Sequence, residues 1–202
     1  MISESEWGRI TKGAALGMLA RAYLYNGDWQ QSADAAKQVM DLEVNYTLFP
    51  NYSELFTEPN EVNDEVIFPV TFERGLGGEG SAFGYYPGSR FADHMRPLPS
   101  LANAYYCIDG LPVDQSPLYN PDHESENRDP RFKATLVANG DTWKGNLVEE
   151  QPTYYMRKWT EEDHDLDHAD SGQDWYILRY AHILLIRAEA LAQLGTENEA
   201  EV

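Results

Sequence analysis

The chain begins with small and apolar residues that recur every three or four positions. Ala15 and Leu19 follow this spacing, which lines one face of a helix. Gly27 and Asp28 then interrupt it, because glycine ends a helix in the left-handed conformation without steric cost and aspartate caps the next helix. Residues 7–42 are therefore predicted to form a helical hairpin.

A similar pattern returns near the end of the sequence, where residues 175–194 are predicted to form one long amphipathic helix. Gly195 ends this helix, and residues 197–202 are predicted to begin another. Small residues at helix crossings and a glycine in the turn are typical of tetratricopeptide hairpins. With the two turn glycines aligned, four positions match at identical spacings: Ala20, Tyr23, Gly27 and Ser32 against Ala188, Leu191, Gly195 and Ala200.

The middle of the chain, residues 43–174, has a different character. Residues 65–72 are rich in β-branched and aromatic side chains, which predicts a strand. Pro69 has no N–H to donate to a neighbouring strand, so the strand is expected at a sheet edge. The remainder is dense in Gly, Pro, Asn and Asp, which favours turns. We therefore predict a single, mainly α domain with tetratricopeptide-like helical hairpins at 7–42 and 175–202, separated by a long loop-rich insertion containing short strands.

Composition and charge narrow the classes of function. The 202 residues are 42% hydrophobic with a mean hydropathy of -0.57, which favours a packed globular domain over a disordered or membrane-embedded chain. The net charge of -19 repels polyphosphates, so nucleic acid is not expected as a partner. No apolar run approaches the about 18 residues of a membrane span. Any export signal or lipid anchor is expected outside this sequence.

Three glycines, Gly75, Gly77 and Gly80, satisfy the G-x-G-x-x-G pattern of dinucleotide sites. Such a site needs a helix directly after the glycines, because the helix N-terminus binds the pyrophosphate. The residues that follow up to Gly88 show no helical periodicity. We predict no nucleotide cofactor.

An acidic stretch carries Asp163, Asp165 and Asp167, which with Asp174 match the spacing of oxygen ligands in an EF-hand calcium loop. His168 stands where that loop requires glycine for its sharp turn. The favoured interpretation is a solvated linker whose last Asp or Ser caps the following helix. We predict no metal site, and calcium is the open alternative.

Catalytic motifs do not emerge from the sequence. There is no G-x-S-x-G nucleophile elbow, and Cys107 is the single cysteine, with apolar flanks that favour a buried structural thiol. Carboxylate pairs arise by chance among 34 acidic residues and identify no glycosidase site. The prediction is that the chain is not an enzyme.

Aromatic residues in turn-rich segments are the candidate binding residues, because sugars stack apolar C–H faces on rings while their hydroxyls need polar partners. Tyr85 and Tyr86 lie among glycines with Arg90 close behind, and Trp143 lies in a similar setting. A loop tyrosine that merely covers a core edge is the alternative. The other tryptophans adjoin predicted helices or strands, where packing is expected: Trp7, Trp29, Trp159 and Trp175.

Several phrases in a fixed order extend over nearly the whole chain. They occupy residues 9–16 (RITKGAAL), 19–25 (LARAYLY), 52–56 (YSELF), 63–68 (NDEVIF), 109–113 (DGLPV), 127–132 (NRDPRF) and 178–181 (LRYA). Together they resemble the C-terminal half of SusD/RagB outer-membrane nutrient-binding lipoproteins.

The resemblance implies a non-catalytic protein on the outer face of the outer membrane in Bacteroidota. Members bind oligosaccharides, or in some branches peptides, as a lid on a SusC-type TonB-dependent transporter, and a lipid anchor holds them. The loop after the 65–72 strand often contributes to the ligand site, which carries the role to Tyr85, Tyr86 and Arg90. Arg128 and Arg131 are expected to hold loops by pairing with carboxylates. The alternative is a protein-interaction or peptide-binding helical-repeat module without a glycan site.

Overall fold

The computed structural model describes residues 7–75, 96–143, 145–149, 154–160 and 171–196. The chain divides into two compact units. The first unit comprises residues 1–50, 61–71 and 174–202, and the second comprises residues 51–60 and 72–173.

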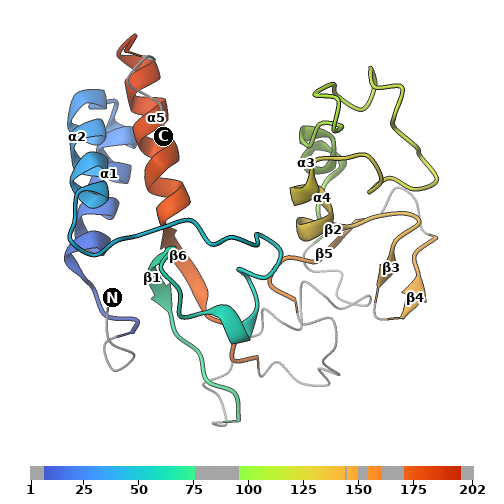
Figure 1. Ribbon diagram of the computed structural model, residues 1–202, viewed down its shortest axis with the longest axis horizontal. Helices are drawn as coiled ribbons and strands as arrows, with labels where there is room; N and C mark the ends of the chain where they lie inside the picture. Colours follow the sequence, from blue (N-terminus) through green and yellow to red (C-terminus); the bar gives the residue numbers. More distant parts are fainter. Residues whose placement is uncertain (1–6, 76–95, 144, 150–153, 161–170, 197–202) are drawn as a thin grey trace. The chain divides into compact units, whose positions relative to one another are not determined.

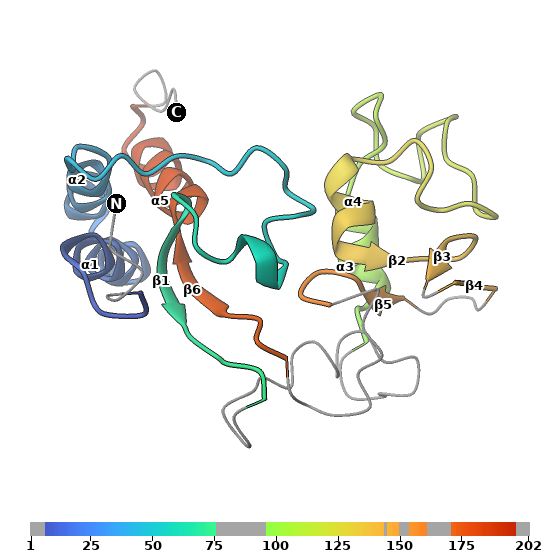
Figure 2. The same cartoon turned by 60° about the horizontal axis from the view of Figure 1, so that its bottom comes forward.

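Three helices form the body of the first unit: α1 (Lys12–Asn26), α2 (Trp29–Met40) and α5 (Tyr180–Gln193). They lie side by side in both ribbon views (Figures 1 and 2). The helix α1 begins after Thr11, whose hydroxyl accepts a hydrogen bond from the Ala14 N–H at 3.1 Å. This contact satisfies one of the free N–H groups of the first turn.

The two turn glycines end their helices in the same way. Gly27 has φ +80° and Gly195 has φ +70°, both in the left-handed region that glycine adopts without strain. In each turn the glycine N–H donates to the carbonyl three residues earlier, and the next N–H donates to the carbonyl five residues earlier. The glycine alignment made from the sequence therefore corresponds to one repeated helix-ending motif.

Small residues allow the helices of the first unit to approach closely. Ala20 and Ser32 are fully buried, and the Ser32 hydroxyl donates to the Ala20 carbonyl at 2.9 Å, linking α1 to α2. A Cβ added at Gly17 would lie 2.3 Å from a methyl carbon of Leu178. Only glycine at that position of α1 allows this approach.

Residues Trp175–Arg179 form a strand, β6, which corrects the prediction of one long helix from Trp175. β6 pairs antiparallel with β1 (Val66–Val70), with an irregular register around Phe68 and Pro69. The segment is rich in aromatic and β-branched residues, and pairing with a distant strand overrides the helical pattern. Only α5, from Tyr180, is helical.

Two aspartates expected to cap helices have other roles. Asp28 stands before α2, but its carboxylate accepts a hydrogen bond from the Asn26 amide at 2.7 Å and makes no cap contact. Asp174 precedes a strand instead of a helix, is 2% exposed, and accepts a hydrogen bond from the Trp7 indole N–H at 2.7 Å.

Glu65 connects the parts of the first unit through one buried side chain, which is 3% exposed. One carboxylate oxygen pairs with the Arg179 guanidinium at 2.5 Å, and the other accepts the Phe49 N–H at 2.7 Å. Its backbone carbonyl accepts the Tyr180 N–H at 2.8 Å. The residue therefore joins the start of β1, the end of β6, the first residue of α5 and the 44–50 segment.

The second unit has short elements joined by turns: a 3-10 turn at Glu58–Asn60, α3 (Pro99–Ala104), α4 (Pro130–Thr135), β2 (Leu136–Val137), β3 (Thr142–Trp143), β4 (Asn146–Leu147) and β5 (Tyr155–Met156). β2 pairs with β5 and β3 pairs with β4, both antiparallel. A small core includes Ala102, Phe132, Leu136, Ala138 and Tyr154. In the described parts of the chain, no helix is long and apolar enough to cross a bilayer.

The Glu65–Arg179 pair is expected to contribute far more to stability than an exposed ion pair. Glu65→Ala should lower the free energy of unfolding by about 3 kcal/mol, because it removes a buried ion pair and the acceptor of the Phe49 N–H. Asp41→Ala is the control, since Asp41 pairs with Lys37 at 2.8 Å while both side chains are more than half exposed. That change should cost less than about 1 kcal/mol in urea denaturation. Equal losses for the two variants would contradict this expectation.

Candidate ligand-binding site

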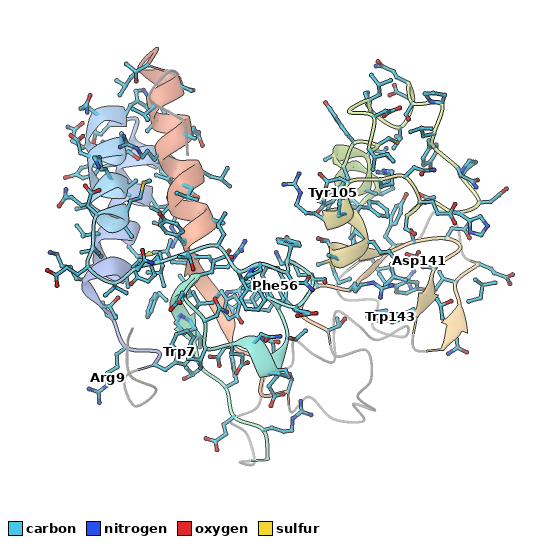
Figure 3. The ribbon with its side chains drawn as sticks, viewed as in Figure 1. Trp7, Arg9, Phe56, Tyr105, Asp141 and Trp143 are labelled. Carbon is cyan, nitrogen blue, oxygen red and sulfur yellow. The ribbon has the colours of Figure 1, made fainter. Side chains whose placement is uncertain are left out.

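Of the four residues predicted to contact ligand, Tyr85, Tyr86 and Arg90 lie outside the described residues, and Trp143 lies within them. Trp143 is on β3, is 4% exposed, and packs with Val137 and Tyr155 (Figure 3). The Arg157 guanidinium lies 4.9 Å from its ring centroid. The chain's own side chains cover the ring, so the structure favours packing over sugar stacking for Trp143.

A substitution pair separates these two roles of Trp143. Trp143→Ala should lower the free energy of unfolding by about 3–5 kcal/mol, as other truncations of buried aromatic residues do. Tyr106→Ala is the control in the same unit, because Tyr106 is 52% exposed and its loss should change stability little. Chemical denaturation gives both values. A stable Trp143→Ala variant with weakened ligand binding would instead support direct contact.

The acidic stretch proposed for calcium lies mostly outside the described residues, since only Asp174 among its candidate ligands is described. That carboxylate is already engaged with the Trp7 indole. Within the described ranges, no group of three or more His, Cys, Asp and Glu side chains lies close enough to hold a metal ion.

Arg128 organises the turn-rich loops of the second unit from their interior. It is 4% exposed and donates to the carbonyls of Ala102, at 2.5 Å, and Tyr105, at 2.9 Å. Its guanidinium also lies 4.3 Å from the ring centroid of Phe132. Carboxylate partners were expected for Arg128, but its guanidinium bonds to carbonyls at the C-terminal end of α3, because the last carbonyls of a helix need other donors.

Arg131 behaves as expected and pairs with Asp129 at 2.5 Å. Asp129 also accepts the Arg131 N–H and so caps α4. These hydrogen bonds lower the pKa of Asp129. Cys107 is buried as predicted and forms a backbone bridge with Arg128, which connects the 105–113 turn to the start of α4.

Two buried acidic residues fix further loops. The Tyr154 hydroxyl donates to Glu124 at 2.6 Å, and burial raises the pKa of Tyr154, so the phenol remains a hydrogen-bond donor at neutral pH. The Asp141 carboxylate accepts the Ala138 N–H at 2.9 Å and the Ser125 hydroxyl at 2.5 Å. The loops therefore have fixed anchors despite little regular secondary structure.

The first unit contains a pocket that the sequence did not indicate. Its volume is about 330 Å³, and it is lined by Trp7, by part of the 44–50 segment and by residues 62–66. Trp7 was expected to pack against predicted elements, and no site was predicted in the other two segments. No local motif marks the pocket, because its walls are distant in sequence and meet only in the folded unit.

Comparison with known proteins identifies the family. The sequence profile of the SusD family matches residues 64–202. This chain belongs to the SusD family. A SusD-like carbohydrate-binding protein from Bacteroides fragilis has a TM-score of 0.82 and 26% identity, covering 96% of this chain and 42% of that protein. A second SusD-like protein from Bacteroides fragilis has a TM-score of 0.76 and 25% identity, covering 99% of this chain and 46% of that protein.

The SusD-like protein P25 of Formosa agariphila is 21% identical over 161 residues, which cover 80% of this chain and 28% of that protein. This chain therefore spans less than half the length of the SusD-family relatives it matches. The structural likeness confirms the predicted mainly α, tetratricopeptide-like fold.

The phrases that resembled SusD/RagB proteins meet in the structure of this SusD-family chain. Glu65 from the 63–68 phrase pairs with Arg179 from the 178–181 phrase. Cys107, beside the 109–113 phrase, bridges Arg128 of the 127–132 phrase. The phrases therefore supply the internal contacts that hold each unit together.

Proposed function

We propose that this SusD-family chain captures oligosaccharides at the cell surface without chemical conversion and presents them to a SusC-like TonB-dependent transporter. The observation that carries the proposal is family membership together with the likeness to a carbohydrate-binding protein at a TM-score of 0.82 over 96% of the chain. A lipid anchor would hold the protein on the outer face of the outer membrane.

The chemistry of the chain favours neutral sugars as ligands. Its net charge of -19 repels anionic polymers. Aromatic rings in the turn-rich segments can stack on the C–H faces of a sugar, and polar side chains there can bond to its hydroxyl groups. We place ligand contact at Tyr85 and Tyr86 for stacking and at Arg90 for hydroxyl orientation. Trp143, covered by its neighbours, supports the second unit from within.

A glycan panel tested by calorimetry checks the proposed contacts. Wild-type protein should bind at least one neutral oligosaccharide, and Tyr85→Ala and Tyr86→Ala should each weaken binding by about 2–10-fold, the loss expected for one ring contact. Tyr25→Ala is the control, because Tyr25 is 80% exposed on α1 and belongs to no proposed site. Unchanged affinity in both loop variants would place the ligand elsewhere.

The transporter partner requires its own experiment. Affinity purification of the anchored protein from an outer membrane that contains its SusC-like transporter should recover that transporter.

Exposed apolar residues on the helices, Leu19 on α1 and Leu185 on α5, favour the alternative of a protein-interaction module. Recovery of the transporter combined with no ligand on the panel would support that alternative. Turnover of a labelled oligosaccharide would contradict the non-catalytic assignment.

A further inference from the structure

The pocket of the first unit has the dimensions of a small-molecule site. Its volume of about 330 Å³ lies within the range of ligand pockets, about 300–1,000 Å³. It is concave, and its lining is mostly apolar with a few polar groups. Trp7, which Figure 3 labels, contributes to one wall. This combination of an apolar body with a few polar groups is what small-ligand sites share.

The walls are fixed before any ligand arrives. The Glu65 carboxylate accepts the Phe49 N–H at 2.7 Å, and the Thr47 N–H donates to the Asp64 carbonyl at 3.2 Å. These two bonds tie the 44–50 segment to residues 62–66. The Trp7 ring is oriented separately by its hydrogen bond to buried Asp174. A preformed pocket lowers the entropy lost when a ligand binds.

The chemistry of the lining resembles that of a sugar site. Trp7, Tyr46 and Phe49 supply aromatic surface, and Tyr46 is held in place by stacking on Tyr180, with ring centroids 6.2 Å apart. The polar side chains of the lining are Thr47, Asn63, Asp64 and Glu65, of which Thr47 and Asp64 are exposed. The rings can stack on the apolar C–H faces of a sugar. The hydroxyl and the carboxylate beside them can form hydrogen bonds with its hydroxyl groups.

Charge at the pocket selects among sugars. Glu65 is neutralised by Arg179, but Asp64 is an exposed carboxylate with no cation bonded to it among the described residues. A uronate or sulfated sugar would meet this negative charge and the net charge of -19. A neutral sugar avoids the repulsion and can donate its hydroxyl protons to the carboxylate, which accepts strong hydrogen bonds.

We propose that this pocket is a second carbohydrate site, which binds one neutral sugar residue against Trp7 with Asp64 as the acceptor of its hydroxyl groups. This second-site proposal rests on the proposed function only for the chemical class of its ligand, a carbohydrate. The site is separate from the proposed contacts at Tyr85, Tyr86 and Arg90.

Tryptophan fluorescence of the 202-residue chain, titrated with maltose, cellobiose and lactose, tests the site. At least one disaccharide should change the emission of the wild type, and Trp7→Phe should remove that change. Asp64→Ala should weaken binding by about tenfold, consistent with loss of a hydrogen bond to a charged group. Asp64→Asn, which keeps an acceptor, should restore part of the affinity. Asp34→Ala is the control, since Asp34 is an exposed acid on α2.

The outcomes separate this inference from the proposed function. No emission change with any disaccharide, or a change that persists at full affinity in Asp64→Ala, would overturn the second site. An emission change with an acetylated leucine amide and with no sugar would also overturn it, because it would identify an apolar peptide pocket. Glycan binding lost only in Tyr85→Ala and Tyr86→Ala would leave the proposed function standing without this site. Binding that depends on Asp64 and not on those tyrosines would support this site alone.

Discussion

The first unit depends on one constraint, the need to pair the buried carboxylate of Glu65. A carboxylate taken out of water is unfavourable unless charge and hydrogen bonds replace the solvent. Arg179, 114 residues from Glu65 along the chain, and the Phe49 N–H, 16 residues away, provide that replacement. Pairing this side chain therefore holds the end of β6 beside the start of β1 and holds the 44–50 segment that walls the pocket, while the Glu65 backbone carbonyl accepts the first N–H of α5.

The second unit has little regular secondary structure, and buried polar side chains fix its loops. Carbonyls at the C-terminal end of α3 and in the loops need donors, because backbone acceptors without donors are unfavourable. Arg128 supplies several N–H donors from one planar group and reaches carbonyls of two segments. Asp141 and Glu124 provide the converse, acceptors for loop donors. Irregular backbone is thereby fixed, and a fixed loop loses less entropy when it binds a ligand.

The sequence predicted those features that local chemistry determines. The spacing around Gly27 and Gly195 predicted two equivalent helix ends, and their hydrogen bonds are the same. The prediction of a helix from Trp175 was wrong because pairing with β1, about a hundred residues earlier, decided the conformation. Burial of Trp143 was likewise set by Tyr155 on another strand. The pocket at Trp7 has no local signal, since each wall alone is ordinary loop or strand sequence.

The phrases that resemble the family contribute mostly to the scaffold. Glu65, Arg128 and Arg179 all lie within the phrases that resemble SusD/RagB proteins, and all three make internal contacts. Of the groups proposed to bind sugar in the pocket, Asp64 also lies within a phrase, whereas Trp7 and Thr47 lie outside the phrases. Phrases of this kind can therefore identify the scaffold and the general class of function without identifying the ligand. Asp64 and the side chains between the phrases are proposed to set specificity, because the scaffold fixes their positions and their own chemistry selects the ligand.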